Sequence, residues 1–276
     1  MTTYRALDFE FVLQVDDPAL RDYVETVFDA LVVDERATEV LEVIRITATE
    51  DGSASRYDVR HGDAELGTGV TAPAAVDAIV QRANSRCVDS SGWLSTHASC
   101  VSRDGHAILF AAHSESGKST LAAGLVRAGF AYVTDEAVAF DWDAGCIQPY
   151  PKPISLDPGS WPLFPELDPR ATYTDDAPFS QWHVPAAHVG PGRVSAPCRA
   201  RWLVFPKYEA GADTAIAPIT RGEALVEWSK NTFRFNEHGR RALELLGGLV
   251  TDVDCYRMTV GDLDDAVARV EELVGA

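Results

Sequence analysis

The segment at residues 111–120, which reads AAHSESGKST, constrains the fold of this chain more than any other feature. An apolar run of strand length precedes it at residues 106–112, and a helical pattern rich in Leu and Ala follows at residues 118–128 and is closed by Gly129. A turn that ends in Gly-Lys-Ser-Thr directs backbone N–H groups and a lysine toward one point, where the helix dipole favours an anion. The segment therefore predicts an α/β fold with a phosphate-binding loop; the alternative is an ordinary strand-to-helix connection.

The loop departs from the full phosphate-loop pattern at two positions. Ala112 stands where that pattern has glycine, and Glu115 adds a negative charge. A carboxylate within about 4 Å of a phosphate costs on the order of 1–4 kcal/mol at a surface-like dielectric. The sequence is therefore compatible with two alternatives, a working nucleotide site and one that binds a nucleotide weakly. The residues expected to contact a nucleotide are Ser114, Glu115, Ser116, Gly117, Lys118, Ser119 and Thr120.

Two acids follow the next expected strand. Residues 130–134 predict that strand, and Asp135 and Glu136 come directly after it. In open α/β sheets, ligands lie beyond the carboxyl ends of the strands, on the side of the phosphate loop. Carboxylates at this edge are placed to hold Mg²⁺ or to accept a proton from an attacking hydroxyl. The alternative is a surface turn, where acids are common.

A hairpin signal precedes the loop. Asp104-Gly105 predicts a two-residue turn that pairs Arg103 with His106. Continuing this register outward pairs His97 with Ala112. We therefore expect His97 beside the loop as a proton-handling or orienting group, with an ordinary structural histidine as the alternative.

Together these pieces resemble the catalytic domain of HPr kinase/phosphorylase and its relatives. The resemblance covers roughly residues 91–276 and is carried by His97, residues 114–120 and the stretch VTDEAV at residues 133–138. The segments PKPISLDPGSW (151–161) and LVFPKY (203–208) and the surroundings of Cys255 and Tyr256 are also similar. Because glycines of the family are replaced at Ala112 and Glu115, and a Gly-rich signature is missing, the chain resembles a divergent relative and not a true HPr kinase.

The resemblance implies an α/β fold in which a mixed sheet carries the phosphate loop, with ATP and Mg²⁺ at the site. By this implication Lys118 binds the β- and γ-phosphates, Ser119 binds Mg²⁺ with Glu136, Asp135 is the base and His97 assists it. We therefore expect an ATP-dependent kinase that transfers the γ-phosphoryl group to a hydroxyl of a small molecule or peptide. The alternatives are a non-catalytic nucleotide- or peptide-binding module on the same fold, and a phosphotransferase that uses another donor.

Composition narrows the partners. The 276 residues carry a net charge of −18, which makes a nucleic-acid backbone a poor partner. No apolar run approaches a membrane span and the first residues lack a secretory signal, so we expect a cytoplasmic protein without membrane association; a homo-oligomer stays open. The five cysteines form no CxxC pair and predict free buried thiols.

The chain is expected to contain two domains, a small N-terminal α/β subdomain at residues 1–90 and the kinase domain at residues 91–276. In the first, patterns predict strands at 6–15, 41–48 and 55–60, the latter two around an Asp51-Gly52 turn, and helices at 17–31 and 73–86. In the second, the Pro-rich residues 151–197 predict an acceptor-binding loop or lid, or an ordinary surface excursion, and His183 and His188 are too isolated for a metal site. Helices are expected at 221–236, with Arg234 as a weak candidate cation, and at 262–274.

Overall fold

The computed structural model describes residues 2–34, 42–51, 54–90, 92–113, 116–171 and 177–275. The chain divides into two compact units: unit 1 is Met1–Ser91 with Lys152–His188, and unit 2 is Gly92–Pro151 with Val189–Ala276. The single boundary expected after residue 90 therefore misses the return of residues 152–188 to unit 1. This return is fixed by β13 (Trp182–Val184), whose His183 is hydrogen-bonded to Asp77 of unit 1.

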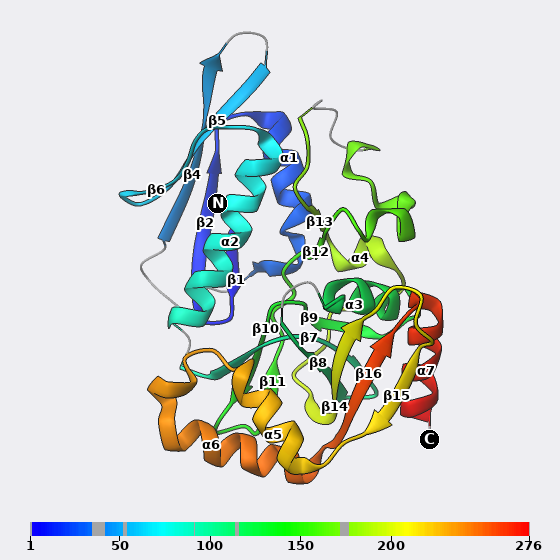
Figure 1. Ribbon diagram of the computed structural model, residues 1–276. Helices are drawn as coiled ribbons and strands as arrows, with labels where there is room; N and C mark the ends of the chain where they lie inside the picture. The colour runs from blue at the N-terminus through cyan, green and yellow to red at the C-terminus, as the bar shows by residue number, and fades with distance from the viewer. Residues whose placement is uncertain are drawn as a thin grey trace. The chain divides into compact units, whose positions relative to one another are not determined.

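Unit 1 contains a six-stranded sheet in the order β3-β1-β2-β4-β5-β6 (Figure 1). Its strands are β1 (Thr3–Ala6), β2 (Phe9–Val15), β3 (Val32–Val33), β4 (Glu42–Asp51), β5 (Ala54–His61) and β6 (Ala64–Val70). Only β2 and β4 pair in parallel within this sheet. Helix α1 (Pro18–Val27) connects toward β3, and α2 (Ala72–Ser90) follows β6.

Helix packing in unit 1 follows the apolar spacing of the sequence. Asp17 caps α1 by accepting a hydrogen bond from the Ala19 amide at 2.9 Å. Pro18 occupies the first helical position, where its missing N–H costs no helical hydrogen bond. In α2 the buried residues recur three and four apart, which marks one face against the sheet. They are Ala72, Ala75, Val76, Ile79, Val80, Ala83 and Cys87.

Unit 1 departs from the expected elements in two places. The strand expected at residues 6–15 is present as β2 but begins at Phe9, because the chain reverses at Leu7, whose φ is +56°, after β1 ends at Ala6. Helix α1 ends at Val27 and is followed by a 3-10 turn at Asp29–Leu31, so the helix expected to reach residue 31 is shorter. The expected turn at Asp51-Gly52 lies outside the described residues at Gly52.

Unit 2 is a mixed eight-stranded sheet in the order β11-β10-β7-β8-β14-β16-β15, with β9 also pairing with β7. Its strands are β7 (Leu94–Arg103), β8 (His106–Ala111), β9 (Ala131–Thr134), β10 (Ala137–Asp141), β11 (Cys146–Gln148), β14 (Arg199–Tyr208), β15 (Ala215–Pro218) and β16 (Asp254–Val260). Strand β14 runs parallel to both β8 and β16, and the other pairs are antiparallel. The expected mixed α/β class is therefore confirmed.

The hairpin expected at Asp104-Gly105 is present. Both residues have positive φ, 52° and 78°, as a tight hairpin turn needs, and Arg103 pairs with His106. The ladder ends at Ala98 and Ala111, however, so the expected pairing of His97 with Ala112 is wrong. His97 pairs with Ala137 of β10 instead, and its amide donates to the carbonyl O of Asn231 at 2.7 Å.

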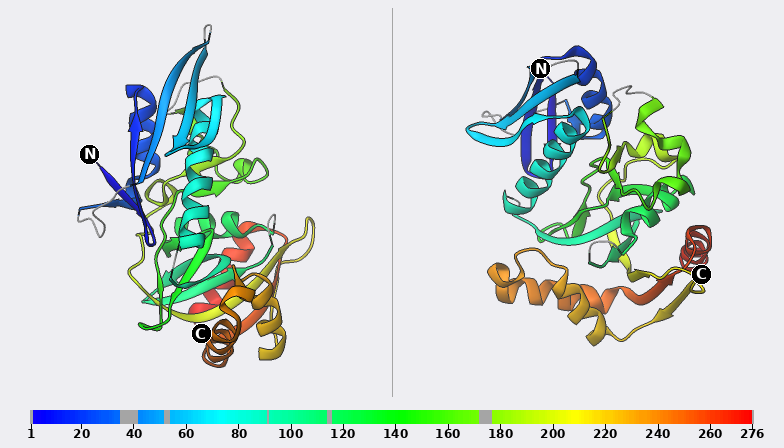
Figure 2. Two further views of the ribbon diagram at one scale, coloured as in Figure 1. Left: turned by 90° about the vertical axis from the view of Figure 1, so that its left-hand side faces the viewer. Right: turned by 45° about the horizontal axis from the view of Figure 1, so that its top comes forward.

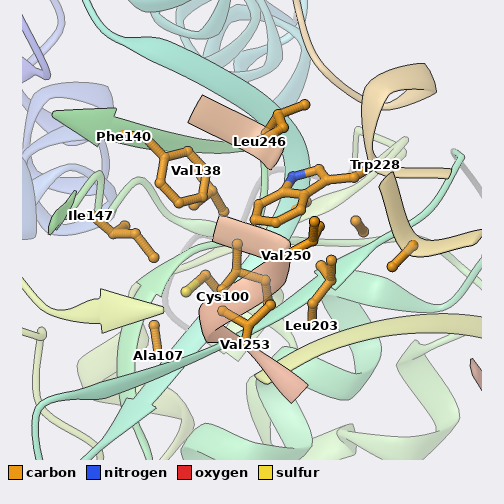
Figure 3. Close-up of a cluster of buried hydrophobic side chains, with 14 of the residues drawn as sticks. Cys100, Ala107, Val138, Phe140, Ile147, Leu203, Trp228, Leu246, Val250 and Val253 are labelled. Atoms are coloured by element: carbon orange, nitrogen blue, oxygen red, sulfur yellow. The ribbon is translucent and has the colours of Figure 1, made fainter. Parts of the chain in front are cut away.

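The core of unit 2 centres on Trp228 (Figure 3). This side chain is fully buried, meets the Phe140 ring edge-on at 5.6 Å between centroids, and donates from Nε1 to Thr96 Oγ1 at 3.0 Å. Apolar residues of the sheet pack around it together with residues of one helix. They include Cys100, Val138, Ile147 and Leu203 from the strands and Leu246 and Val250 from the helix. The five cysteines are free thiols, as expected; four are buried, also as expected, whereas Cys146 is only half-buried.

The helix expected at residues 221–236 is broken. Helix α5 (Arg221–Lys230) ends before Asn231, and α6 (Phe235–Asp252) begins after Arg234; the two lie side by side (Figure 2, yellow to orange). The break arises because residues 231–233 bond to strand β7: the Asn231 carbonyl accepts from His97 N, and Phe233 N donates to the Ser95 carbonyl at 2.8 Å.

Two further helices complete unit 2. Helix α3 (Lys118–Arg127) follows β8, and α7 (Leu263–Gly275) ends the chain; Asp262 caps α7 by accepting from the amides of Asp264 and Asp265. The two helices pack closely at Gly124, where an added Cβ would lie 2.9 Å from Leu263 Cδ1. A glycine at this position therefore sets the distance between α3 and α7.

Candidate functional site

A loop connects the end of β8 to the start of α3. Strand β8 ends at Ala111 and α3 begins at Lys118, as expected. Gly117 precedes the helix with φ at +85°, a left-handed conformation that favours glycine, and its position carries no side-chain cap. Gly117 thus offers no side chain to the first turn of α3, and the dipole of that helix favours an anion at this end. Ser114 and Glu115 lie outside the described residues.

Lys118 is almost fully buried, with 6% of its surface exposed. Its Nζ donates to the His113 carbonyl O at 2.6 Å and lies 3.5 Å from Ser116 Oγ. Burial lowers the pKa of Lys118, while the negative charges of Glu136 and Asp135 act to raise it. The ammonium of the loop and the two acids that follow β9 thus share one electrostatic environment.

Asp135 lies at the end of β9 with 3% of its surface exposed. The Tyr132 hydroxyl donates to its Oδ1 at 2.8 Å. Burial raises the pKa of Tyr132 well above its ordinary value, and the charge of Asp135 raises it further, so Tyr132 keeps its proton and remains a donor. The hydroxyl thereby fixes one carboxylate oxygen of Asp135.

Glu136 and His97 meet across the neighbouring strands. The carbonyl O of Glu136 accepts from the Ala98 amide at 3.2 Å, and His97 Nε2 lies 3.9 Å from Glu136 Oε1. The imidazole stacks on the Phe233 ring at 5.7 Å between centroids, with 26° between planes. His97 is thus positioned by β10 and by the segment between α5 and α6, and not by the loop residue Ala112.

The structure brings together the catalytic residues expected from sequence. Lys118, Asp135, Glu136 and His97 form a connected set through the charges on Lys118 and the contact between Glu136 and His97. Ser116, Ser119 and Thr120 are half-buried at the start of α3. Ser119 follows Lys118 directly, so it belongs to the same helix end.

Three supporting residues were not expected from the sequence. Tyr132 bonds to Asp135, Phe233 stacks on His97, and the Ser99 hydroxyl donates to the Lys118 carbonyl at 3.1 Å. A polar residue two positions after His97 on an expected strand was a usable signal for Ser99, because alternate residues share one face. Phe233 carried no such signal, since it lies 136 residues from His97 in the chain.

The other sequence candidates have different roles. The Arg234 guanidinium pairs with Glu237 of α6 at 2.8 Å, and its backbone φ of +50° marks the break before that helix. His183 bonds to Asp77 and Ser155, while His188 lines a cavity of unit 1. Among the residues that the structure describes, no three His, Cys, Asp or Glu side chains gather as a metal site.

The arrangement combines three kinds of group. A buried lysine stands at the start of α3, a tyrosine holds a buried carboxylate, and a second carboxylate lies beside an imidazole. Such groups can bind an anion and accept a proton. No family model matches the chain, and no curated protein matches it in sequence. None of the described helices is both long and apolar enough to cross a membrane.

Proposed function

We propose that this chain is a kinase with an HPr-kinase-like phosphate-loop fold, which transfers the γ-phosphoryl group of ATP to a hydroxyl of a small molecule or a peptide. One observation carries the proposal: Lys118 is almost fully buried at the start of α3, in the same unit that buries Asp135 at the end of β9. Phosphoryl transfer depends mainly on positioning and on neutralising charge, and these groups supply both.

In the proposed reaction, the acceptor oxygen bonds to the γ-phosphorus while the bond from phosphorus to the β–γ bridging oxygen breaks, and ADP leaves. Asp135 takes the proton of the acceptor hydroxyl. The hydrogen bond from the Tyr132 hydroxyl orients the Asp135 carboxylate. Lys118 and the first-turn amides of α3 neutralise the charge on the phosphate oxygens. His97 assists by orienting Glu136 from 3.9 Å.

Mg²⁺ fits the oxygen ligands at this site. The hydroxyl of Ser119 and the carboxylate of Glu136 are the donors that this ion prefers, and Glu136 acts electrostatically on Lys118, the neighbour of Ser119. Bound there, the ion supplies charge neutralisation for the phosphate groups.

A non-catalytic nucleotide-binding module is the second candidate, and one contact favours it. Lys118 Nζ already donates to the His113 carbonyl at 2.6 Å, so a nucleotide has to replace this hydrogen bond before the lysine reaches a phosphate. Binding without turnover is the expected behaviour if the loop keeps this contact.

Titration calorimetry with Mg·ATP tests the nucleotide site. We expect Lys118→Met to weaken binding at least about tenfold, or about 1.4 kcal/mol, because the charge is lost while the buried stem keeps its packing. Lys207→Met is the matched control, since Lys207 is exposed in the same unit and pairs only with Glu209 among the contacts described. Equal affinities of the Lys118 variant and the wild type would overturn the proposal.

A further inference from the structure

Unit 1 holds a second group of chemically matched side chains. Lys152 precedes β12 (Ile154–Leu156), Ser155 lies within that strand, and His183 lies in β13. The antiparallel register places Ser155 directly opposite His183. Asp77 of α2 completes the group.

These four side chains form one continuous chain of hydrogen bonds. Lys152 Nζ lies 2.9 Å from Ser155 Oγ, Ser155 Oγ lies 3.2 Å from His183 Nδ1, and His183 Nε2 lies 2.7 Å from Asp77 Oδ1. A lysine ammonium only donates, so the serine hydroxyl donates onward to Nδ1, and the Nε2–H donates to the carboxylate. This direction makes His183 the base for the Ser155 proton, oriented by Asp77.

Burial separates this group from an ordinary surface network. Lys152 is 1% exposed and His183 is 5% exposed, whereas Ser155 keeps part of its surface open between the buried Ile154 and Leu156. The Ser180 hydroxyl also donates to Asp77, which holds the second carboxylate oxygen. A purely structural network explains the bond between His183 and Asp77, but it does not require a serine held by both a lysine and an imidazole.

A cavity adjoins the imidazole. It has a volume of about 360 Å³, and its walls combine the apolar Val27 and Leu167 with the polar or charged Glu166, Asp168, His183 and His188; Ser155 is not among the lining residues. Burial raises the pKa of Tyr23, which also lines this cavity, and the charge of Asp77 raises it further.

We propose that Ser155 is a nucleophile for acyl transfer, activated by His183 and Asp77, and that its substrate is an activated ester. Ser155 Oγ bonds to the acyl carbon as its proton passes to His183 Nδ1. The bond from that carbon to the alcohol oxygen breaks, and the departing alkoxide takes the proton from His183. Water then attacks the acyl carbon as His183 takes one of its protons. The bond from that carbon to Ser155 Oγ breaks, Oγ regains the proton from His183 and the acid leaves; Lys152 stabilises the negative charge that develops on Oγ as this bond breaks.

This inference goes beyond the proposed kinase function and depends on none of its residues. Its closest structural alternative predicts the same hydrogen bonds without reactivity at Ser155. Covalent chemistry at that one atom therefore separates the two.

Active-site labelling of the full chain with a fluorophosphonate, followed by peptide mass spectrometry, is the first measurement. We expect a single adduct on Ser155 in the folded protein and none after heat denaturation. Absence of an adduct on Ser155 in the folded wild type would overturn the proposal, and this result does not depend on any variant folding.

Release of nitrophenol from p-nitrophenyl acetate is the second measurement. We expect Ser155→Ala and His183→Gln each to lower the rate at least about 100-fold, the usual size of a nucleophile or base contribution. Ser160→Ala is the matched control, because Ser160 is a buried serine of the same unit that does not belong to the hydrogen-bond chain. An unchanged rate in a Ser155→Ala protein with the wild-type unfolding midpoint contradicts the assignment.

Discussion

Burial determines the chemistry of single residues in unit 2. Lys118 and Asp135 are both almost fully buried, and a hydrogen bond fixes the position of each side chain. An ion removed from water is costly, and burial lowers the pKa of Lys118 although the negative charges of Glu136 and Asp135 act to raise it. A ligand anion would have to displace the hydrogen bond from Lys118 Nζ to the His113 carbonyl.

The base assignment makes a residue-scale prediction. Asp135→Asn removes the proton acceptor but keeps an oxygen that accepts from the Tyr132 hydroxyl. We expect phosphoryl transfer to fall at least about 100-fold, with the affinity for Mg·ATP changed by less than about threefold. Phosphate transfer to serine-like compounds and peptides, measured beside calorimetry, checks both.

Asp143→Asn is the control for that experiment, because Asp143 lies in the turn between β10 and β11 and is exposed. Full transfer activity in the Asp135 variant would remove this residue from the proposed mechanism while leaving the nucleotide site intact.

Tyr4 gives a pH dependence with a defined sign. Burial raises the pKa of Tyr4 from 10.0 to about 12, with Glu25 and Asp29 adding to the effect. The unfolded chain releases this proton first, so the stabilisation is complete below about pH 10 and is lost as the pH rises toward about 12. The loss is on the order of 2–3 kcal/mol.

Urea unfolding at about pH 9 and about pH 12 checks this sign. Tyr4→Phe should lose less stability over that interval than the wild type, because the variant has no proton to release at this position. Tyr208→Phe, at an exposed tyrosine, should lose as much as the wild type. Identical losses in all three proteins would contradict the role of Tyr4.

At the scale of elements, the contact between α3 and α7 depends on one small residue. A Cβ on Gly124 would lie 2.9 Å from Leu263 Cδ1 and 3.0 Å from Val267 Cγ2. We expect Gly124→Val to destabilise unit 2 by about 1–3 kcal/mol through overpacking, as measured by the free energy of unfolding in urea.

The matched change is Gly248→Val on the exposed side of α6, where an added Cβ meets nothing within 4 Å. There the substitution replaces a poor helix former without a clash, so we expect no loss of stability. Equal destabilisation by both variants would show that the loss at position 124 does not come from the α3–α7 contact.

The whole molecule carries a charge that opposes its own compactness. Acidic residues number 42 and basic residues 24, so the net charge is −18. Raising NaCl from about 10 mM to about 150 mM shortens the screening length from about 30 Å to about 8 Å. We expect the unfolding midpoint to rise by about 2–4 °C as self-repulsion weakens.

Differential scanning calorimetry in NaCl and in KCl checks this prediction, since screening depends on ionic strength and gives the same rise for both salts. A midpoint that falls with salt would mean that local ion pairs, such as Arg5 with Glu10, outweigh the overall repulsion.

Local signals in the sequence were sufficient for several parts of unit 2. The hairpin at Asp104-Gly105 follows from residues that accept positive φ, and α3 follows from apolar spacing closed at Gly129, whose φ is +96°. The place of Asp135 at the end of β9 follows from the strand pattern of residues 130–134. Each of these rests on interactions among neighbours in the chain.

Long-range contacts decided what local patterns could not. The break between α5 and α6 arises from hydrogen bonds to β7, more than 130 residues away, so the helical pattern at 221–236 gave no sign of it. The same holds for the pairing of His183 with Asp77, which returns residues 152–188 to unit 1. Backbone groups of a strand need partners wherever they lie, and this need overrides local helix propensity.

By itself the sequence determined the mixed α/β class, the strand–loop–helix at residues 106–128 and the candidate residues Lys118 and Asp135. Only the tertiary structure decided which side chains contact the candidate residues: the Tyr132 hydroxyl donates to Asp135, and the Phe233 ring stacks on His97. Propensity and turn chemistry act over a few residues and can be read from the chain, whereas burial and hydrogen-bond partners exist only once distant segments have packed.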